Sequence, residues 1–150
     1  IECLVFGKRA VEASRKAAVQ EAAPSFGTRY HCNKTYAGRY VQLKQDIARI
    51  MTVHAGIIRN AALLQEGLEE LEKLEWIIPT EKDEYYSLLS HNLITVARLI
   101  IRSALYRQES RGGHFREDYP ESNDDYLFHI VQQRGKEIYT RPINLNITDK

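Results

Sequence analysis

Three consecutive segments with helical spacing of apolar residues constrain the fold of this chain more than any other feature. The first, about residues 39–54, repeats at intervals of three and four through Leu43, Ile47, Ile50, Met51 and His54. The second, about residues 61–76, carries one stripe of Leu64, Leu68, Leu71 and Leu74. The third and longest runs from about Thr80 to Gln108. Short connections at Gly56 and Pro79 favour antiparallel neighbours, so the pattern predicts a three-helix bundle, spectrin-repeat-like, over residues 39–108.

The third of these segments has a broad apolar face. Its expected positions in the seam of the bundle are Tyr86, Leu89, Leu93, Val96, Ala97, Ile100 and Ala104. Ile94, Ile101 and Leu105 widen this face, as expected of a helix that is clasped between two others. We therefore expect Leu93 and Ile100 to be fully buried.

Two regions flank the predicted bundle. Residues 1–23 are rich in Ala, Lys, Arg and Glu and predict one further helix from Glu2, which Pro24 and Gly27 close, and residues 24–38 predict a connector. Residues 109–150 predict an extended arm and tail, with one short helix at about 123–134 and a strand within 136–148. The fold class is thus all-α, a three-helix bundle preceded by one further helix and followed by an extended C-terminal arm. The chain opens in an apolar run without Met, which we interpret as a piece of a longer protein.

The start of this arm, E-S-R-G-G-H-F-R-E-D-Y-P from Glu109 to Pro120, is dense in charge. We expect Gly112 and Gly113 to end the helix and Pro120 to prevent its resumption. The expected local pairs are Glu109 with Arg111, Arg116 with Glu117 or Asp118, and His114 with an acid. A solvated, salt-bridged turn is the simplest interpretation. The candidate functional residues are Glu109, Arg111, His114, Arg116, Asp118 and Tyr119.

Composition narrows the classes of partner. The chain has 43% hydrophobic and 27% charged residues, and its 21 basic and 20 acidic side chains give a net charge of +1. This balance provides no field for a polyanion, so no nucleic-acid partner is expected. The longest apolar runs fall short of the roughly 20 residues that span a bilayer, so no membrane partner is expected, and we expect a cytoplasmic protein.

The sequence predicts no catalytic, cofactor-binding or metal-ligating residue. Cys3 and Cys32 have neither C-x-x-C spacing nor a histidine set, and the G-x-S-x-G, G-x-G-x-x-G and P-loop patterns are absent. We interpret His54 and His91 as structural residues. A metal at His114 and Asp118 is improbable, and Asp124 with Asp125 is more typical of exposed charges at a helix start than of an acid–base pair.

Four ordered blocks carry a family resemblance: Glu2–Ala10, Met51–Asn60, Asn92–Leu105 and the arm Glu109–Pro120. Together they resemble the C-terminal part of L-aspartate oxidase and of its relatives, the flavoprotein subunits of succinate dehydrogenase and fumarate reductase. The form E-C-L-V-F-G and the block at Asn92–Leu105 look more like aspartate oxidase. The connector at 24–38 and the tail at 136–150 match no family pattern.

The resemblance implies a parent enzyme that oxidises L-aspartate to iminoaspartate for quinolinate and NAD synthesis. Its non-covalent FAD is reoxidised by oxygen or fumarate and is held by an upstream domain, so this chain is expected to be a structural C-terminal domain, inactive alone. Its expected partner is its own N-terminal flavin domain, which Arg111, His114 and Arg116 would contact. Residues 1–23 are expected to self-associate or to lack order when that domain is missing. The alternatives are the respiratory subunits and a free-standing helical interaction module.

Overall fold

The structure is a computed structural model of the 150-residue chain that describes residues 32, 34–75, 78 and 85–143. The expected helix at 2–23, most of the connector and the end of the tail lie outside this part. The described elements, in chain order, are α2 (Lys34–His54), β1 (Ile58–Arg59), α3 (Ala61–Glu75), α4 (Tyr85–Tyr106), β2 (Phe115–Arg116), the 3-10 turn η1 (Asp124–Tyr126), β3 (Phe128–Val131) and β4 (Tyr139–Pro142).

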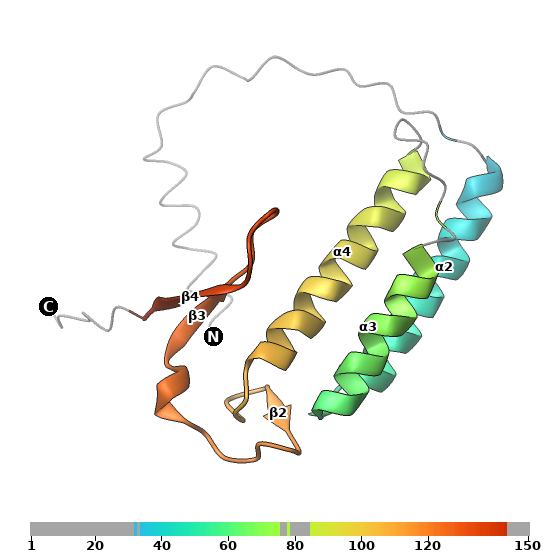
Figure 1. The fold of residues 1–150 in the computed structure, drawn as a ribbon. Helices are drawn as coiled ribbons and strands as arrows, with labels where there is room; N and C mark the ends of the chain where they lie inside the picture. Colours follow the sequence, from blue (N-terminus) through green and yellow to red (C-terminus); the bar gives the residue numbers. More distant parts are fainter. Residues whose placement is uncertain (1–31, 33, 76–77, 79–84, 144–150) are drawn as a thin grey trace, which may run out of the picture.

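The three helices form an antiparallel bundle, as the sequence predicts (Figure 1). α2 starts five residues earlier than expected and buries its predicted face, with Ile50 only 1% exposed. α3 buries Leu64 and Leu71 completely, and Leu68 and Leu74 pack against the core. The prediction of a mainly helical fold built on a three-helix bundle is therefore confirmed.

The seam of α4 differs from the prediction. Its buried residues are Ser87, Ser90, Ile94, Ala97, Ile101 and Ala104. Val96 and Ile100, both expected in the seam, are 55% and 45% exposed, and Leu93 is only partly buried. α4 is apolar on two sides, and α2 and α3 cover the side that carries the small residues, because small side chains allow helices to approach closely. The expectation that Leu93 and Ile100 are fully buried is wrong.

By length and composition alone, with a mean hydropathy of 1.2, α4 could cross a membrane. The core helix of a soluble protein passes the same test. In this structure α4 packs against both other helices, and the guanidinium of Arg98 forms an ion pair with Glu75 on α3 at 2.7 Å.

Two glycines allow close contacts at the end of α2 and between α2 and α3. A Cβ at Gly56 would lie 2.5 Å from the carbonyl oxygen of Thr52, so a larger residue would disturb the turn that follows α2. A Cβ at Gly67 would lie 2.8 Å from Cβ of His54. His54 is 6% exposed, and its Nε2 lies 3.3 Å from Oε1 of Glu70. This histidine is part of the helix packing, in line with its structural interpretation.

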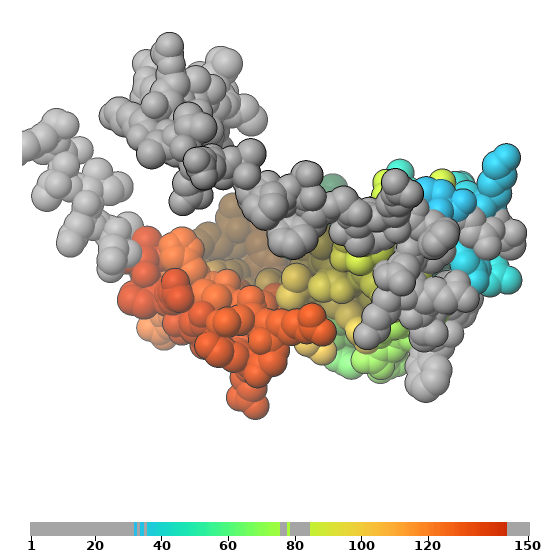
Figure 2. Space-filling view, turned by 90° about the horizontal axis from the view of Figure 1, so that it is seen from above, coloured from blue at the N-terminus to red at the C-terminus, as the bar shows by residue number. Residues whose placement is uncertain are grey.

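The prediction of a short helix at about 123–134 is wrong. Only Asp124–Tyr126 forms a 3-10 turn, because the side chain of Asn123 accepts a hydrogen bond from the Asp125 N–H at 2.9 Å and holds a local turn. β3 follows at once and pairs antiparallel with β4, with Phe128 opposite Pro142 and Val131 opposite Tyr139. β4 lies within the expected strand. The hairpin lies beside α4, to which Gln132 donates hydrogen bonds at Leu99 O and Ser103 Oγ, both 2.7 Å (Figures 1 and 2).

The revised seam makes a stability prediction. Ile101→Ala removes a side chain with no exposed surface and should lower the free energy of unfolding by about 2–5 kcal/mol. Val53→Ala, on α2 at a position that is 53% exposed, is the control and should change it by less than about 0.5 kcal/mol. Urea denaturation of both variants measures the difference, and equal losses would show that α4 is rotated differently.

Candidate functional site

A buried arginine closes the C-terminal end of α4. Arg116 is 1% exposed, and its Nη1 donates to the carbonyl oxygens of Ala104 at 2.8 Å, Leu105 at 3.4 Å and Arg107 at 3.2 Å. The last carbonyls of a helix have no partner within the helix and carry its negative dipole end. The guanidinium therefore satisfies these groups and places a positive charge where the helix favours one.

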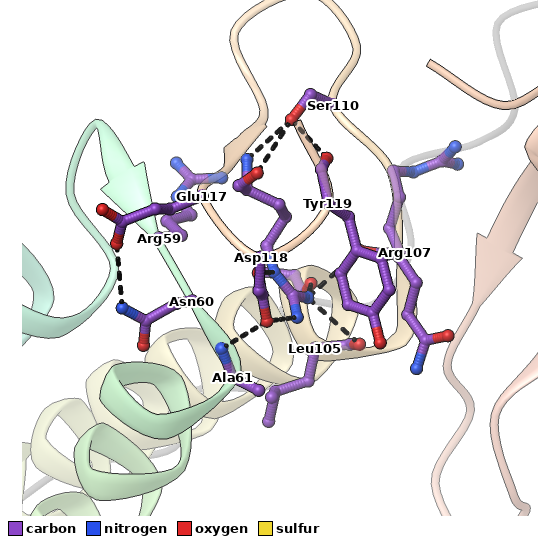
Figure 3. A network of polar contacts seen from close by, with 12 residues as sticks. Arg59, Asn60, Ala61, Leu105, Arg107, Ser110, Glu117, Asp118 and Tyr119 are labelled. Carbon is purple, nitrogen blue, oxygen red and sulfur yellow. Dashed lines mark hydrogen bonds and ion pairs between the residues drawn. The ribbon is translucent and has the colours of Figure 1, made fainter. Parts of the chain in front are cut away.

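Asp118 joins this arginine to the next helix. Its two carboxylate oxygens accept from Arg116 Nε and Nη2, each at 2.7 Å, which is the bidentate arrangement of an arginine fork. Oδ2 also accepts from the backbone N–H of Ala61 at 2.9 Å, at the first residue of α3 (Figure 3). A carboxylate at a helix N-terminus is favoured by the helix dipole. One ion pair thus connects the end of α4 with the start of α3.

The backbone reinforces this connection. β1 and β2 pair in parallel, with Arg59 opposite Arg116, and the Glu117 N–H donates to Arg59 O at 2.7 Å. Asn60 caps α3 by accepting from the Leu63 N–H at 2.9 Å and donates to Glu117 Oε2 at 3.3 Å (Figure 3). The segment after α4 therefore folds back across the bundle end.

Ser110 and a tight turn shape the fold-back. The Ser110 hydroxyl accepts from the Arg116 N–H at 2.8 Å and donates to Tyr119 O at 2.8 Å (Figure 3). Arg111 and His114 exchange backbone hydrogen bonds of 2.8 and 3.1 Å around Gly112 and Gly113. Gly112 has φ +59°, a conformation that glycine adopts at little cost. The glycines thus turn the fold-back and do not end the helix as expected, because α4 ends earlier, at Tyr106.

Glu109 is a second buried acid of this site. It has no exposed surface and accepts from Arg107 Nη1, Arg111 Nε and the Asn123 N–H, the last two at about 3 Å. Burial alone would raise its pKa, but the hydrogen bonds from Arg111, Asn123 and Arg107 outweigh burial and lower the pKa to about 2. Arg107 also donates to Tyr126 O and Phe128 O, both at 2.9 Å, so Glu109 holds the guanidinium that fixes the start of β3.

His114 completes the set that we call the polar clasp: Arg59, Asn60, Glu109, Ser110, His114, Arg116 and Asp118. Arg59 Nη1 donates to its Nδ1 at 2.9 Å, and its Nε2 donates to Arg107 O at 3.3 Å. Because arginine has no acceptor, Nδ1 must be unprotonated. Burial lowers the pKa of His114, and the charges of Arg59, Arg116 and Arg107 act in the same direction. The expectation of an acid beside His114 is therefore wrong.

The structure brings the six predicted site residues into one region. The expected pairs Glu109–Arg111 and Arg116–Asp118 are confirmed. Tyr119 lies under the Arg116 guanidinium, 5.1 Å from ring centre to Cζ. Glu109 and Arg116 are 0% and 1% exposed, so these two residues act from inside the fold.

Sequence reasoning missed Arg59, Asn60, Ser110 and Arg107. Asn60 directly precedes the apolar stripe of α3, and an asparagine at this position predicts a helix cap. The other contacts join positions far apart in sequence, such as Arg59 and His114, and no local pattern predicts them.

An open groove lies beside the clasp. It has a volume of about 440 Å³ and runs between α4 and β3, with Val96, Leu99, Ile100 and Ile130 in its walls and Arg59 and His114 at one end. Among the described residues no group of three His, Cys, Asp or Glu side chains could hold a metal ion.

Comparison with known proteins decides the family. Residues 44–149 match the fumarate reductase flavoprotein C-terminal family. The chain belongs to this family. An uncharacterized FAD-dependent oxidoreductase of Methanocaldococcus jannaschii is 33% identical over 112 residues, 70% of this chain and 20% of that protein. L-aspartate oxidase of Synechocystis is 32% identical over 122 residues, 66% of this chain and 22% of that protein.

Solved structures show the same fold at low identity. The E. coli quinol fumarate reductase flavoprotein superposes with a TM-score of 0.56 at 20% identity, covering 73% of this chain and 22% of that one. A chain of the Mycobacterium smegmatis Sdh1 complex superposes with a TM-score of 0.55 at 24% identity, covering 90% of this chain and 24% of that one. The chain therefore spans about a fifth to a quarter of the length of the proteins it matches. The family that it matches is that of the C-terminal part of these flavoproteins.

The ion pair at the centre of the clasp can be tested by mutation. Asp118→Asn leaves the buried Arg116 charge without its carboxylate. The loss of one partner of a buried ion pair should lower the free energy of unfolding by about 3–5 kcal/mol. Glu117→Gln, at the exposed neighbour, is the control and should cost less than about 1 kcal/mol. Denaturation of both variants distinguishes them, and an Asp118→Asn loss as small as the control would contradict the central role of the pair.

The clasp also predicts acid sensitivity. The hydrogen bonds from Arg116 lower the pKa of Asp118 from 3.8 to about 2, although its burial acts in the opposite direction. The pKa of Glu109 is lowered from 4.5 to about 2. Because the pKa values of both carboxyl groups are lower in the folded state, their ionised forms stabilise the fold. This stabilisation is complete above pH 4.5 and is lost as the pH falls toward 2. Glu109→Gln should show a smaller drop in unfolding free energy across this interval than the unmodified chain. An equal drop would assign the acid sensitivity to other groups.

Proposed function

We propose that this chain is the C-terminal helical domain of an FAD-dependent L-aspartate oxidase. The observation that carries the proposal is the sequence similarity to several L-aspartate oxidases over more than half of the chain. L-aspartate oxidase of Pyrococcus furiosus, for example, is 40% identical over 81 residues, which are 54% of this chain. In this proposal the parent enzyme oxidises L-aspartate to iminoaspartate in the cytoplasm, and the product feeds quinolinate and NAD synthesis.

FAD does not fit the described part of the chain. The parallel strands β1 and β2 have two residues each and are joined through α3 and α4, and β3 and β4 form a separate antiparallel pair. The described residues therefore contain no multi-stranded parallel sheet of the kind that holds a dinucleotide. In this proposal the flavin is held by another part of the parent, and the described residues support that part.

The role of this domain is to present a rigid surface to the flavin domain. The clasp fixes the turn that carries Phe115 and Tyr119, which are 39% and 40% exposed on the outer side. Arg111, with a side chain that is 38% exposed, lies on the same segment and is held by Glu109 from within. Arg116 and His114 act by holding this segment in place. A rigid, internally satisfied support is what positions a site on a neighbouring domain.

A second candidate parent is a succinate dehydrogenase flavoprotein subunit. The Coxiella burnetii subunit is 32% identical over 114 residues, 69% of this chain and 19% of that protein. This level of similarity is close to that of the aspartate oxidases, so the substrate separates the two candidates.

The test uses the chain alone and the chain together with its encoded upstream sequence. The chain alone should give no saturable quenching of FAD fluorescence, whereas the longer protein should bind FAD and lose flavin absorbance when L-aspartate is added without oxygen. Succinate is the control substrate. Reduction by succinate and not by aspartate would assign the chain to a respiratory flavoprotein, and micromolar FAD binding by the chain alone would contradict the scaffold role.

A further inference from the structure

A polar pocket lies between the middle of α4 and the turn that joins β3 to β4. Its volume of about 840 Å³ lies within the range of about 300–1,000 Å³ that is usual for small-molecule sites. One wall is a stripe of α4 that includes Leu99 and Arg102, and the other is the turn at residues 132–138, which lies beside α4 (Figure 1). The pocket adjoins the open face of α4, formed by Val96, Leu99 and Ile100, because Leu99 also lines the groove.

The hairpin wall of this pocket is held in place by the fold. Gln132 Nε2 donates to the carbonyl oxygen of Leu99 and to the hydroxyl of Ser103, both at 2.7 Å, which fixes the start of the turn on α4. The Lys136 N–H closes the turn by a backbone hydrogen bond of 3.1 Å. Gly135 within it has φ +76°, a conformation that glycine adopts at little cost. A ligand therefore meets a wall that is already formed and does not have to order it.

Three basic side chains line the pocket without an ion-pair partner among the described residues. They are Arg102 on α4 and Arg134 and Lys136 in the turn, and all three are exposed. In contrast, Arg49 and Arg98 on other surfaces of the bundle form ion pairs with glutamates of α3. The pocket therefore carries positive charge that no ion pair within this part of the chain neutralises.

The other polar groups of the lining suit a hydroxylated anion. The Glu137 carboxylate accepts hydrogen bonds from hydroxyl groups, and the side-chain amides of Asn92 and Gln133 both donate and accept. One negative charge among three positive charges leaves a positive excess, which favours an anion. Because the cations lie on both walls, a molecule with two separated anionic groups can contact both walls at once. Phosphate matches these donors, since its oxygens accept the paired N–H groups of an arginine.

We propose that this pocket binds a small soluble molecule that carries two phosphate groups on a hydroxylated core, such as a sugar bisphosphate. Arg102 contacts one phosphate, and Arg134 and Lys136 contact the other, so the ligand bridges α4 and the hairpin. A pocket between two elements favours a free molecule over a lipid headgroup, which a membrane presents at a broad surface. The site lies outside the clasp and is independent of the substrate of the parent enzyme, so it goes beyond the proposed function.

Isothermal titration calorimetry of the chain with fructose bisphosphate tests the site. We expect saturable binding, and inorganic phosphate should bind at least about tenfold more weakly because it contacts one wall only. Arg102→Gln and Arg134→Gln, one on each wall, should each weaken binding of the bisphosphate at least about tenfold, which corresponds to about 1.4 kcal/mol. Arg141→Gln is the matched control. It removes the same charge from β4 outside the pocket, where the guanidinium lies over the ring of Tyr139, and should change the dissociation constant less than about twofold.

The absence of saturable binding by fructose bisphosphate, or an equal affinity for inorganic phosphate, would overturn the proposal. Equal losses in the control and in the two pocket variants would do the same, because they would show a general attraction of anions to the positive charges of the chain. Phosphatidylcholine vesicles that contain phosphatidylinositol bisphosphate test the other source of this chemistry. Tighter binding to these vesicles than to fructose bisphosphate would assign the pocket to a lipid headgroup and contradict a soluble ligand. Circular dichroism checks that the variants, all at exposed positions, remain folded.

Discussion

The ion pair between Arg116 and Asp118 holds together two helix ends that would otherwise leave polar backbone groups without partners. Its arginine satisfies three carbonyls at the end of α4, and its aspartate accepts the first N–H of α3. Each charge therefore faces the helix terminus of opposite sign, and the two charges face each other. A bidentate geometry of 2.7 Å on both oxygens makes the pair directional, which a lysine in place of Arg116 could not achieve.

The remaining polar groups depend on this pair. Because Arg116 fixes the fold-back, Ser110 can bridge two of its backbone groups, and His114 is placed between Arg59 and the carbonyl of Arg107. Burial of this imidazole and the charges of the three guanidiniums around it lower the pKa of His114. Glu109 compensates Arg107 and Arg111, so that the region is not left with an excess of buried positive charge.

The sequence predicts the part of this structure that depends on local periodicity. The stripes of α2 and α3 lie on one side of their helices, and both are buried as expected. α4 could not be oriented in this way, because it is apolar on two sides and only contact with α2 and α3 selects Ile94 and Ile101 over Ile100. The ion pairs within the fold-back join residues two positions apart, so the sequence predicts them. The hydrogen bond from the Ala61 N–H to Asp118 joins residues 57 positions apart, and no local pattern predicts it. At 123–134, a single Asx turn at Asn123 outweighs a weak helical preference.

The clasp and the open face of α4 meet at Arg59, which lines one end of the groove together with His114. Arg59 is held from one side by the backbone of the α2–α3 turn and by His114. These bonds fix the orientation of its guanidinium. A displacement of the clasp would move this arginine relative to the apolar face beside it. This end of the groove is therefore built from residues of the clasp, and the two features form one surface.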